Sequence, residues 1–296
     1  MRAVITGASG FVGQHLTTEL TSHGDEVIAD ATDITDRSAL GAAFAEARPE
    51  VVFHLAAQAD VARSWRDPVA TFRVNAEGTL NVLDAAQAAG VTRVVAITSA
   101  DLYGVVDPRN LPITEAHPLR PVSPYAASKA AADMLCLQAS LGTSLEVIRI
   151  RAFNHLGPGQ SEHFVASAIA KRIAECEHTG ATHVSIGNLQ ARRDFTDVRD
   201  VVRAYRLLAE HGTPGEAYNI CSGVDRSVAE LATLLRDLSS LPITFQEDPA
   251  LLRPVDVPII RGDHTKVTQA TGWSPSIRIE DTLSDLLNDW RRREHP

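Results

Sequence analysis

Cysteine is scarce in this chain. The sequence has three cysteines, Cys136, Cys176 and Cys221, and no two of them stand in a CxxC spacing. This usage argues against a disulfide framework and a structural zinc site, and it fits a reducing compartment. The eleven histidines are also scattered without metal-ligand spacing. We therefore expect no metal centre, and we expect His54, which follows an apolar run, to be a satisfied core histidine.

Long apolar runs and positive net charge are also missing. No uncharged apolar run approaches the roughly 18 to 20 residues of a membrane helix. The first expected strand begins at Arg2, which leaves no room for a signal peptide, so we expect a cytoplasmic protein without a membrane partner. The formal charge of −9 disfavours nucleic acid. Anionic ligands must therefore be held by a few placed arginines and backbone amides.

The stretch TGASGFVG, at 6–13, is the strongest signal present. It follows the apolar run Ala3 to Ile5 and leads into the amphipathic segment Phe11 to Leu20. This order predicts a strand, a tight turn and a helix, with a dinucleotide pyrophosphate at the helix N-terminus. Its three glycines allow the turn, the approach of the phosphates and close helix packing: Gly7, Gly10 and Gly13. The alternative is a glycine-rich surface turn.

Strand-like and helical segments then alternate along the chain, at 27–29, 38–47, 51–55, 69–89 and 94–98. This βαβ rhythm predicts an α/β fold with a doubly wound parallel sheet of the Rossmann type. Asp30 comes at the end of the second strand, where a carboxylate can accept from an adenine ribose 2′-OH. Because no arginine follows Asp30 directly, NAD(H) is favoured and NADP(H) remains possible. Alternatively, Asp30 only starts a turn and Asp33, or neither residue, contacts the ribose.

A second candidate site, a catalytic group, comprises Ser99, Tyr125 and Lys129. Tyr125 and Lys129 stand four residues apart behind Pro124, so they project from one helix face, and Ser99 ends a strand. An ammonium near a phenol favours phenolate, which lets a tyrosine exchange protons near neutral pH. The alternative is a surface tyrosine with a solvated lysine.

Several segments of the chain resemble those of a known enzyme family. The segments TGASGFVG, HLAAQADV (54–61), TSADLYG (98–104) and PYAASK (124–129) resemble the extended short-chain dehydrogenase/reductases that act on nucleotide sugars. RAFNHLGPGQ (151–160), GNLQARRDFTDVRDVV (187–202) and LRPVDVP (252–258) are similar to the GDP-mannose 4,6-dehydratases and GDP-6-deoxy-4-keto-mannose reductases. The dehydratases usually carry glutamine and aspartate in the glycine turn and an arginine-rich loop after the second strand. Phe11, Val12 and the short DATDITD favour the reductase.

The resemblance implies site residues. The catalytic group would comprise Ser99, Tyr125 and Lys129, with Asp101 where dehydratases place a glutamate that takes the C5 proton; Asp101 could instead only orient substrate or bind solvent. The implied cofactor pocket comprises Gly7, Gly10, Phe11, Val12, Gly13, Asp30, Asp33, Ile34, Leu55, Ala56, Ala57, Tyr125 and Lys129.

The resemblance also implies substrate contacts. Asn154, Arg193 and Arg253 match positions that hold the substrate pyrophosphate, and Phe164 and Val165 would line the base pocket. Gln58, Ser64 and Ser99 would touch the sugar. Alternatively, Arg193 pairs with Asp194 or Asp197, and Arg253 is an ordinary loop residue.

We accordingly predict a dinucleotide-binding domain from 1–153 with 186–222, and a smaller, discontinuous substrate domain from 154–185 with 223–296. The expected reaction is NAD(P)H-dependent reduction of the 4-keto group of a GDP-4-keto-6-deoxyhexose, giving a product such as GDP-D-rhamnose. The alternatives are a 4,6-dehydratase acting on GDP-mannose or a 4-epimerase, each with tightly bound NAD, and a catalytically idle nucleotide sensor. The resemblance further implies a homodimer through alanine-rich helices at 69–89 and 124–141, unless these faces only cover the sheet.

Overall fold

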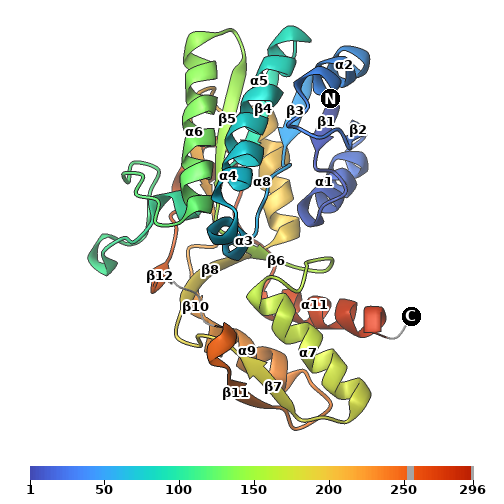
Figure 1. The fold of residues 1–296 in the computed structure, drawn as a ribbon, viewed down its shortest axis with the longest axis vertical. Helices are drawn as coiled ribbons and strands as arrows, with labels where there is room; N and C mark the ends of the chain where they lie inside the picture. The colour runs from blue at the N-terminus through green and yellow to red at the C-terminus, as the bar shows by residue number, and fades with distance from the viewer. Residues whose placement is uncertain (252–256, 295–296) are drawn as a thin grey trace.

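A computed structural model describes residues 1–251 and 257–294 of the chain. Its centre is a six-stranded sheet in the order β2-β1-β3-β4-β5-β9, in which every neighbouring pair is parallel (Figure 1). The strands are β1 (Arg2–Thr6), β2 (Glu26–Asp30), β3 (Val51–His54), β4 (Arg93–Ile97), β5 (Glu146–Ala152) and β9 (Ala217–Ile220). The predicted doubly wound α/β sheet is confirmed.

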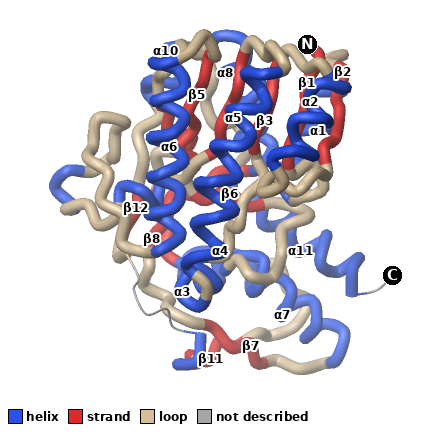
Figure 2. Tube along the Cα trace, turned by 45° about the horizontal axis from the view of Figure 1, so that its top comes forward, coloured by secondary structure: helices blue, strands red, loops and turns tan. Residues whose placement is uncertain are grey.

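Helices cover both faces of this sheet (Figure 2). One layer contains α1 (Phe11–Ser22), α8 (Val198–His211) and α10 (Thr265–Thr271). The other contains α2 (Arg37–Ala47), α5 (Gly78–Ala88) and α6 (Pro124–Gly142). Because β3 is buried on both faces, its residues 51–53 read as an uninterrupted apolar run rather than as an alternating pattern.

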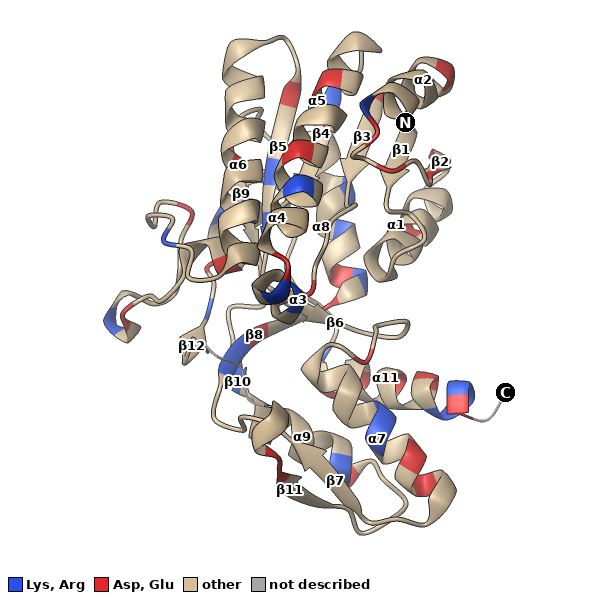
Figure 3. Cartoon of the chain, in the orientation of Figure 1, with Lys and Arg blue, Asp and Glu red and all other residues tan. Residues whose placement is uncertain are grey.

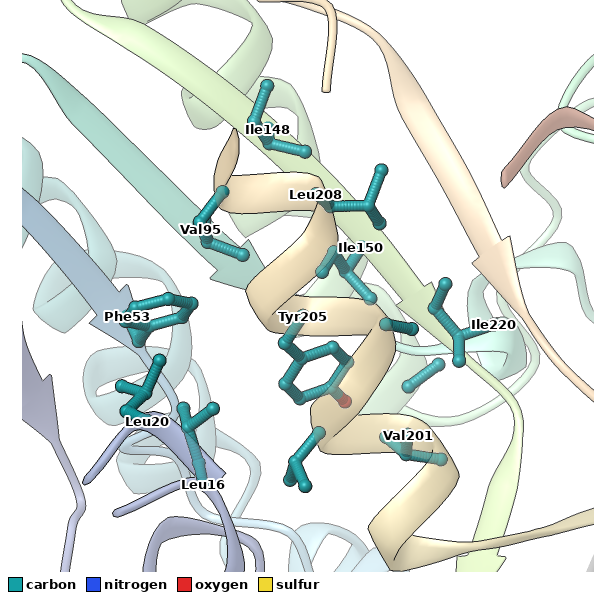
Figure 4. Close-up of a cluster of buried hydrophobic side chains, with 14 of the residues drawn as sticks. Leu16, Leu20, Phe53, Val95, Ile148, Ile150, Val201, Tyr205, Leu208 and Ile220 are labelled. Atoms are coloured by element: carbon teal, nitrogen blue, oxygen red, sulfur yellow. The ribbon is translucent and has the colours of Figure 1, made fainter. Parts of the chain in front are cut away.

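The core of the first layer is shown in Figure 4. Tyr205 and Leu208 of α8 lie against the middle strands, and Leu16 and Leu20 of α1 fill the space beside Phe53. All five side chains are buried. This apolar packing fixes α1, and with it the turn that precedes α1, against the sheet.

The strand order indicates where a ligand crevice lies on the sheet. The chain runs from β1 to β2 on one side and then returns to β3 on the other side of β1. In an open parallel sheet, ligands bind beyond the carboxyl ends of the strands at such a switch point. The loops after β1 and β3 contain Thr6–Gly13 and Leu55–Ala57, so the predicted cofactor residues of these two loops lie at this crevice.

A smaller second part lies below the sheet in Figure 1. It is built on a sheet of β10 (Asp225–Ser227), β8 (Arg192–Asp197) and β12 (Ile259–Ile260), with β6 (Asn154–Leu156) also paired to β8. Beside it lie β7 (His183–Ile186) and β11 (Thr244–Glu247), together with α7 (Val165–Thr179), α9 (Val228–Asp237) and α11 (Ile279–Glu294). Figure 3 shows the basic start of β8, which is Arg192 and Arg193.

The elements do not follow the predicted division throughout. β8 falls in the stretch assigned to the dinucleotide-binding domain, yet it pairs only with strands of the second part. Conversely, α10 falls in the predicted substrate stretch, and its Val267 is buried in the core formed with α8. The division itself stays a prediction.

The expected single helix at 69–89 is wrong in detail. The segment is α4 (Pro68–Phe72), a π-helical turn η1 (Arg73–Glu77) and α5, and it follows a short α3 (Val61–Arg66). The π turn adds a residue to the helical repeat and turns Asn75 into the protein interior. Among the described residues, no helix is both long enough and apolar enough to cross a membrane.

Candidate active site

The glycine turn after β1 is sterically closed to larger residues. Gly7 has φ of +75°, and a Cβ there would lie 2.9 Å from the backbone of Ala56. A Cβ on Gly13 would lie 2.4 Å from the carbonyl oxygen of Gly7. The turn therefore packs tightly against both the loop after β3 and the first turn of α1. No side chain caps α1 at Gly10, which leaves its first amide groups available to an anion.

Asp30 lies beside this turn with an incomplete hydrogen-bond set. Its Oδ1 accepts from the amide of Thr32 at 3.0 Å, whereas its Oδ2 is buried without a partner among the described residues. Next to it is a cavity of about 340 Å³, lined by Ala8, Ser9, Gln14, Thr17, Ala29, Asp30 and Ala31. No lysine or arginine lines this cavity. A ribose hydroxyl would give Oδ2 the donor it lacks.

Asp33 and Ile34 differ from Asp30 in their surroundings. Oδ1 of Asp33 accepts from both the amide and the hydroxyl of Thr35, and these bonds lower the pKa of the exposed Asp33 carboxyl. Ile34 is buried, and its side chain lies where a Cβ on Gly78 would be. Asp33 thus closes a local turn and Ile34 anchors it, while Asp30 faces the cavity.

Ser99, Tyr125 and Lys129 lie together at the carboxyl end of β4, each at most 9% exposed. Ser123 caps α6 by accepting from the amide of Ala126 at 3.1 Å, so the helix begins at Pro124 as its sequence predicts. Nζ of Lys129 donates to the carbonyl oxygen of Ile97 at 3.0 Å. Burial lowers the pKa of Lys129 to about 8.

The pKa of Tyr125 is raised, whereas the sequence predicted that Lys129 would lower it. Burial raises it well above its ordinary value, the charge of Asp101 raises it further, and a hydrogen bond with Ser99 acts in the opposite direction. The expected lowering by Lys129 is absent, because the ammonium of Lys129 is directed at the Ile97 carbonyl. In this state Tyr125 is a protonated phenol, which is the form that a proton donor requires.

Asp101 stands in a short 3-10 helix, η2 (Ala100–Tyr103), directly after Ser99. The amide of Asp101 donates to Oγ of Ser99 at 3.1 Å. The effect of its charge on Tyr125 places its carboxylate near the phenol. The structure therefore groups all four predicted catalytic residues.

His54 is a core histidine, as expected. It is 4% exposed, and its ring nitrogens lie 2.9 Å from Oγ1 of Thr6 and 3.0 Å from Oγ1 of Thr79. Burial, and then the charge of Lys129, lower its pKa to about 3. A neutral His54 thereby ties β3 to the glycine turn, where the amide of Ala56 donates to Oγ1 of Thr6 at 3.3 Å.

Asn75 is a site residue that the sequence analysis missed. Its side chain accepts from the amide of Gln58 at 2.8 Å and donates to the carbonyl of Gln58 at 3.0 Å and to Oγ of Ser128 at 2.9 Å. It therefore links the loop after β3 to the catalytic helix α6. The only sequence signal for this linking role is a polar residue, Asn75, inside an apolar helical pattern.

The predicted sugar contacts are already occupied by protein groups. The side-chain Nε2 of Gln58 donates to the carbonyl of Asp60 and to the hydroxyl of Thr71, both at 3.0 Å. Ser64 lies in α3, is fully buried, and donates to the carbonyl of Val61 at 2.7 Å. Both side chains thus shape the loop around 58–64, and their contact with a sugar stays a prediction.

The predicted nucleotide contacts lie in the second part. Asn154 is exposed at the start of β6, and Phe164, 40% exposed, precedes Val165 at the start of α7. Nη1 of Arg193 donates to the carbonyl of Val257 at 2.6 Å. Arg253 itself lies outside the described residues.

Comparison with known proteins follows this geometry. A family model described as GDP-mannose 4,6 dehydratase matches residues 29–286. The chain belongs to this family. It is 39% identical to the GDP-6-deoxy-D-mannose reductase of Pseudomonas aeruginosa over 99% of this chain and 98% of that protein. It is 31% identical to a UDP-glucose 4-epimerase of Mycolicibacterium smegmatis over 99% of both chains.

Members of the same fold have solved structures. RMD from Pseudomonas aeruginosa complexed with NADPH matches with a TM-score of 0.92 and 37% identity, over 99% of this chain and 100% of that chain. A UDP-glucose 4-epimerase from Thermotoga maritima with UDP-glucose also matches with a TM-score of 0.92, at 28% identity over 100% of both chains. The family membership and the enzyme class expected from the sequence motifs are therefore confirmed.

Proposed function

We propose that this protein reduces the 4-keto group of a GDP-4-keto-6-deoxyhexose to give a GDP-6-deoxyhexose such as GDP-D-rhamnose. The observation that carries the proposal is the buried group Ser99, Tyr125 and Lys129 at the carboxyl end of β4, the strand next to β3. The end-to-end similarity to a GDP-6-deoxy-D-mannose reductase supports the choice of substrate class.

Each residue of this group has a distinct role. Tyr125 is protonated and donates its proton to the C4 oxygen as the ketone becomes an alcohol. Ser99 hydrogen-bonds the same oxygen and orients it. With a dinucleotide bound, Lys129 would hold the nicotinamide ribose, and its charge would stabilise the phenolate of Tyr125.

The residues present fit a nicotinamide dinucleotide. The uncapped first turn of α1 suits its pyrophosphate, and the unpartnered Oδ2 of Asp30 suits an adenosine ribose hydroxyl. When bound in its reduced form, this cofactor supplies the hydride. Asp30 and the absence of cations around its cavity favour NADH. NADPH stays possible, since the similar RMD structure is a complex with NADPH.

The substrate would lie across both parts of the molecule. Asn154, Arg193 and Arg253 would hold its pyrophosphate, and Phe164 and Val165 its base. The exposed ring of Phe164 supports this placement, because an aromatic face can stack on a guanine.

A 4-epimerase or a 4,6-dehydratase is the second candidate, and the matching UDP-glucose 4-epimerases favour it. The test is to incubate the protein with GDP-mannose alone, and separately with its 4-keto-6-deoxy derivative plus NADH or NADPH, and to identify the products. Conversion of GDP-mannose without added cofactor would overturn the reductase. Binding without any turnover would leave the idle nucleotide sensor.

We further propose a homodimer in the cytoplasm. The helices α4, α5 and α6 lie next to one another (Figure 2), and they carry exposed apolar side chains: Val69, Phe72, Leu80, Met134 and Leu141. Such a face is typical of a self-complementary interface between two copies. Ala85 is a poor probe of this contact, because it is 6% exposed and belongs to the core against the sheet.

A further inference from the structure

The first turn of α1 has a second neighbour besides the predicted cofactor. The ring of Phe11 is stacked with that of His155 at a centroid distance of 6.1 Å, and it meets His15 edge-on at 5.5 Å. Nε2 of His15 donates to the carbonyl of Pro158 at 2.8 Å. Phe11 and His15 are one helical turn apart, so a single face of α1 contacts the segment 155–158.

The same segment is bound from the other side by α11. The amide of Gly159 donates to Oδ2 of Asp289 at 2.8 Å. Asp289 is held in turn by Arg293, whose Nη2 lies 2.6 Å from Oδ2. Gly159 has φ of +92°, and a Cβ there would lie 3.5 Å from the ring of Phe11. The loop 157–159 is thus enclosed between the start of α1 and the end of α11.

This loop connects the two predicted ligand sites. Asn154 lies a few residues before this loop in the chain, and Phe164, at the start of α7, lies a few residues after it. Both are predicted substrate contacts, whereas Phe11 is a predicted cofactor contact. The loop 157–159 therefore forms a contiguous contact between the first turns of α1, where the cofactor is predicted, and the segment that precedes Phe164.

The segment also carries an unmet hydrogen bond. Oε1 of Gln160 is buried without a partner among the residues that the structure describes, while its Nε2 donates to the carbonyl of His155 at 2.8 Å. A buried acceptor without a partner is unfavourable, so an arrangement of the segment that supplies a donor to Gln160 would be stabilised.

We propose that His15 and Asp289 are positioning residues that couple the two sites: a dinucleotide on the glycine turn orders the segment 153–164, and this ordering raises the affinity for a nucleoside diphosphate. The proposal rests on the proposed function only for the identity of the second ligand. Coupling of this kind is reciprocal, so the nucleoside diphosphate must also tighten the dinucleotide.

Hydrogen exchange of the full chain with and without NADH tests the first step. In the parent, NADH should slow exchange at both 7–14 and 153–164. In Asp289→Ala, the protection at 7–14 should persist while that at 153–164 falls to within about twofold of the cofactor-free protein. His15→Leu should act in the same way. Equal protection of 153–164 in parent and variants would overturn the proposal.

The matched control is Asp285→Ala. Asp285 lies one turn before Asp289 on α11, and its Oδ2 pairs with Nη1 of Arg199 at 2.9 Å rather than with a backbone amide of the loop. This variant should keep the parent's protection at both segments. Loss of protection at 153–164 in Asp285→Ala would also overturn the proposal, because it would show a general loosening of α11.

Titration with GDP and with UDP, in the presence and absence of NAD⁺, tests the second step. For whichever nucleotide binds, NAD⁺ should raise its affinity about fivefold or more in the parent and less than about twofold in Asp289→Ala. Coupling retained in the variant would contradict the role of Asp289. Failure of the keto-sugar reduction, with this exchange and binding pattern intact, would instead sink the proposed function alone.

Discussion

Lys129 donates from Nζ to the carbonyl oxygen of Ile97 at 3.0 Å, inside the protein and 7% exposed. Burial of this ammonium lowers its pKa to about 8, so the folded protein holds a charge in an unfavourable place at neutral pH. Such a cost is typical of a site arranged for chemistry rather than for stability. Because the pKa of Lys129 is lowered on folding, the free energy of unfolding depends on pH.

The first prediction is that Lys129→Met stabilises the protein at pH 7 while abolishing activity. Below about pH 8 the parent carries the full cost of the buried charge; as pH rises from about 8 toward 10.5 the folded state loses the proton first, and the cost is relieved. The expected gain is about 1–3 kcal/mol at pH 7, and it should shrink across this window. Chemical denaturation of both proteins at several pH values measures it. A gain that grows with pH would contradict the assignment.

The second prediction concerns the proton donor. Tyr125→Phe should lower kcat by roughly 10² to 10⁴, because it removes general acid catalysis, and should leave cofactor affinity nearly unchanged. Steady-state rates with the keto-sugar and a separate NADH titration provide the two readouts. Tyr218→Phe is a suitable control, since Tyr218 is buried on β9 and its hydroxyl accepts from the amide of Thr213. Activity of Tyr125→Phe within a few-fold of the parent would rule out this role.

The third prediction concerns cofactor choice. Asp30→Ala should weaken NADH more than NADPH, because the lost acceptor serves the 2′-OH and the lost charge repels a 2′-phosphate. Asp33→Ala is the matched control, since Oδ1 of Asp33 is occupied by Thr35. Dissociation constants for both cofactors decide the matter. Equal weakening of the two by Asp30→Ala would show that Asp30 does not face the ribose.

The sequence predicted the fold and the grouping of the catalytic residues, because both depend on regular periodicity. Strands β1 to β4 and the start of α6 fall where apolar runs, glycines and Pro124 place them. The departures come from contacts between distant segments. Asn75 is turned inward by a π turn that no local pattern encodes, and the tie of Lys129 to Ile97 depends on tertiary packing. Ser64 is buried, although the flanking Arg63 and Trp65 are exposed.

The fourth prediction concerns assembly. Met134→Glu should convert a dimer into monomers, because it places a charge on the exposed apolar face shared by α4, α5 and α6. Val224→Glu is the control: Val224 is 56% exposed but lies in the second part of the molecule. Light scattering at micromolar concentration reports the mass. A monomeric parent, or a dimer that persists in Met134→Glu, would contradict the interface.

The last prediction separates a reductase from a dehydratase through Asp101. Reduction at C4 needs a proton from Tyr125 and nothing that removes the C5 proton, whereas dehydration needs a carboxylate within about 3 Å of that proton. Asp101 is one methylene shorter than glutamate, and its amide is tied to Ser99, which limits its reach. Asp101→Asn should therefore lose at most a few-fold in reduction, because an amide can still orient a hydroxyl. The neutral residue should also lower the pKa of Tyr125, because the charge that raises it is gone. Consumption of one NAD(P)H per keto-sugar should accompany this tolerance. Solvent deuterium at C5 of a product made from GDP-mannose by the protein alone, with near-complete loss in Asp101→Asn, would establish the dehydratase instead.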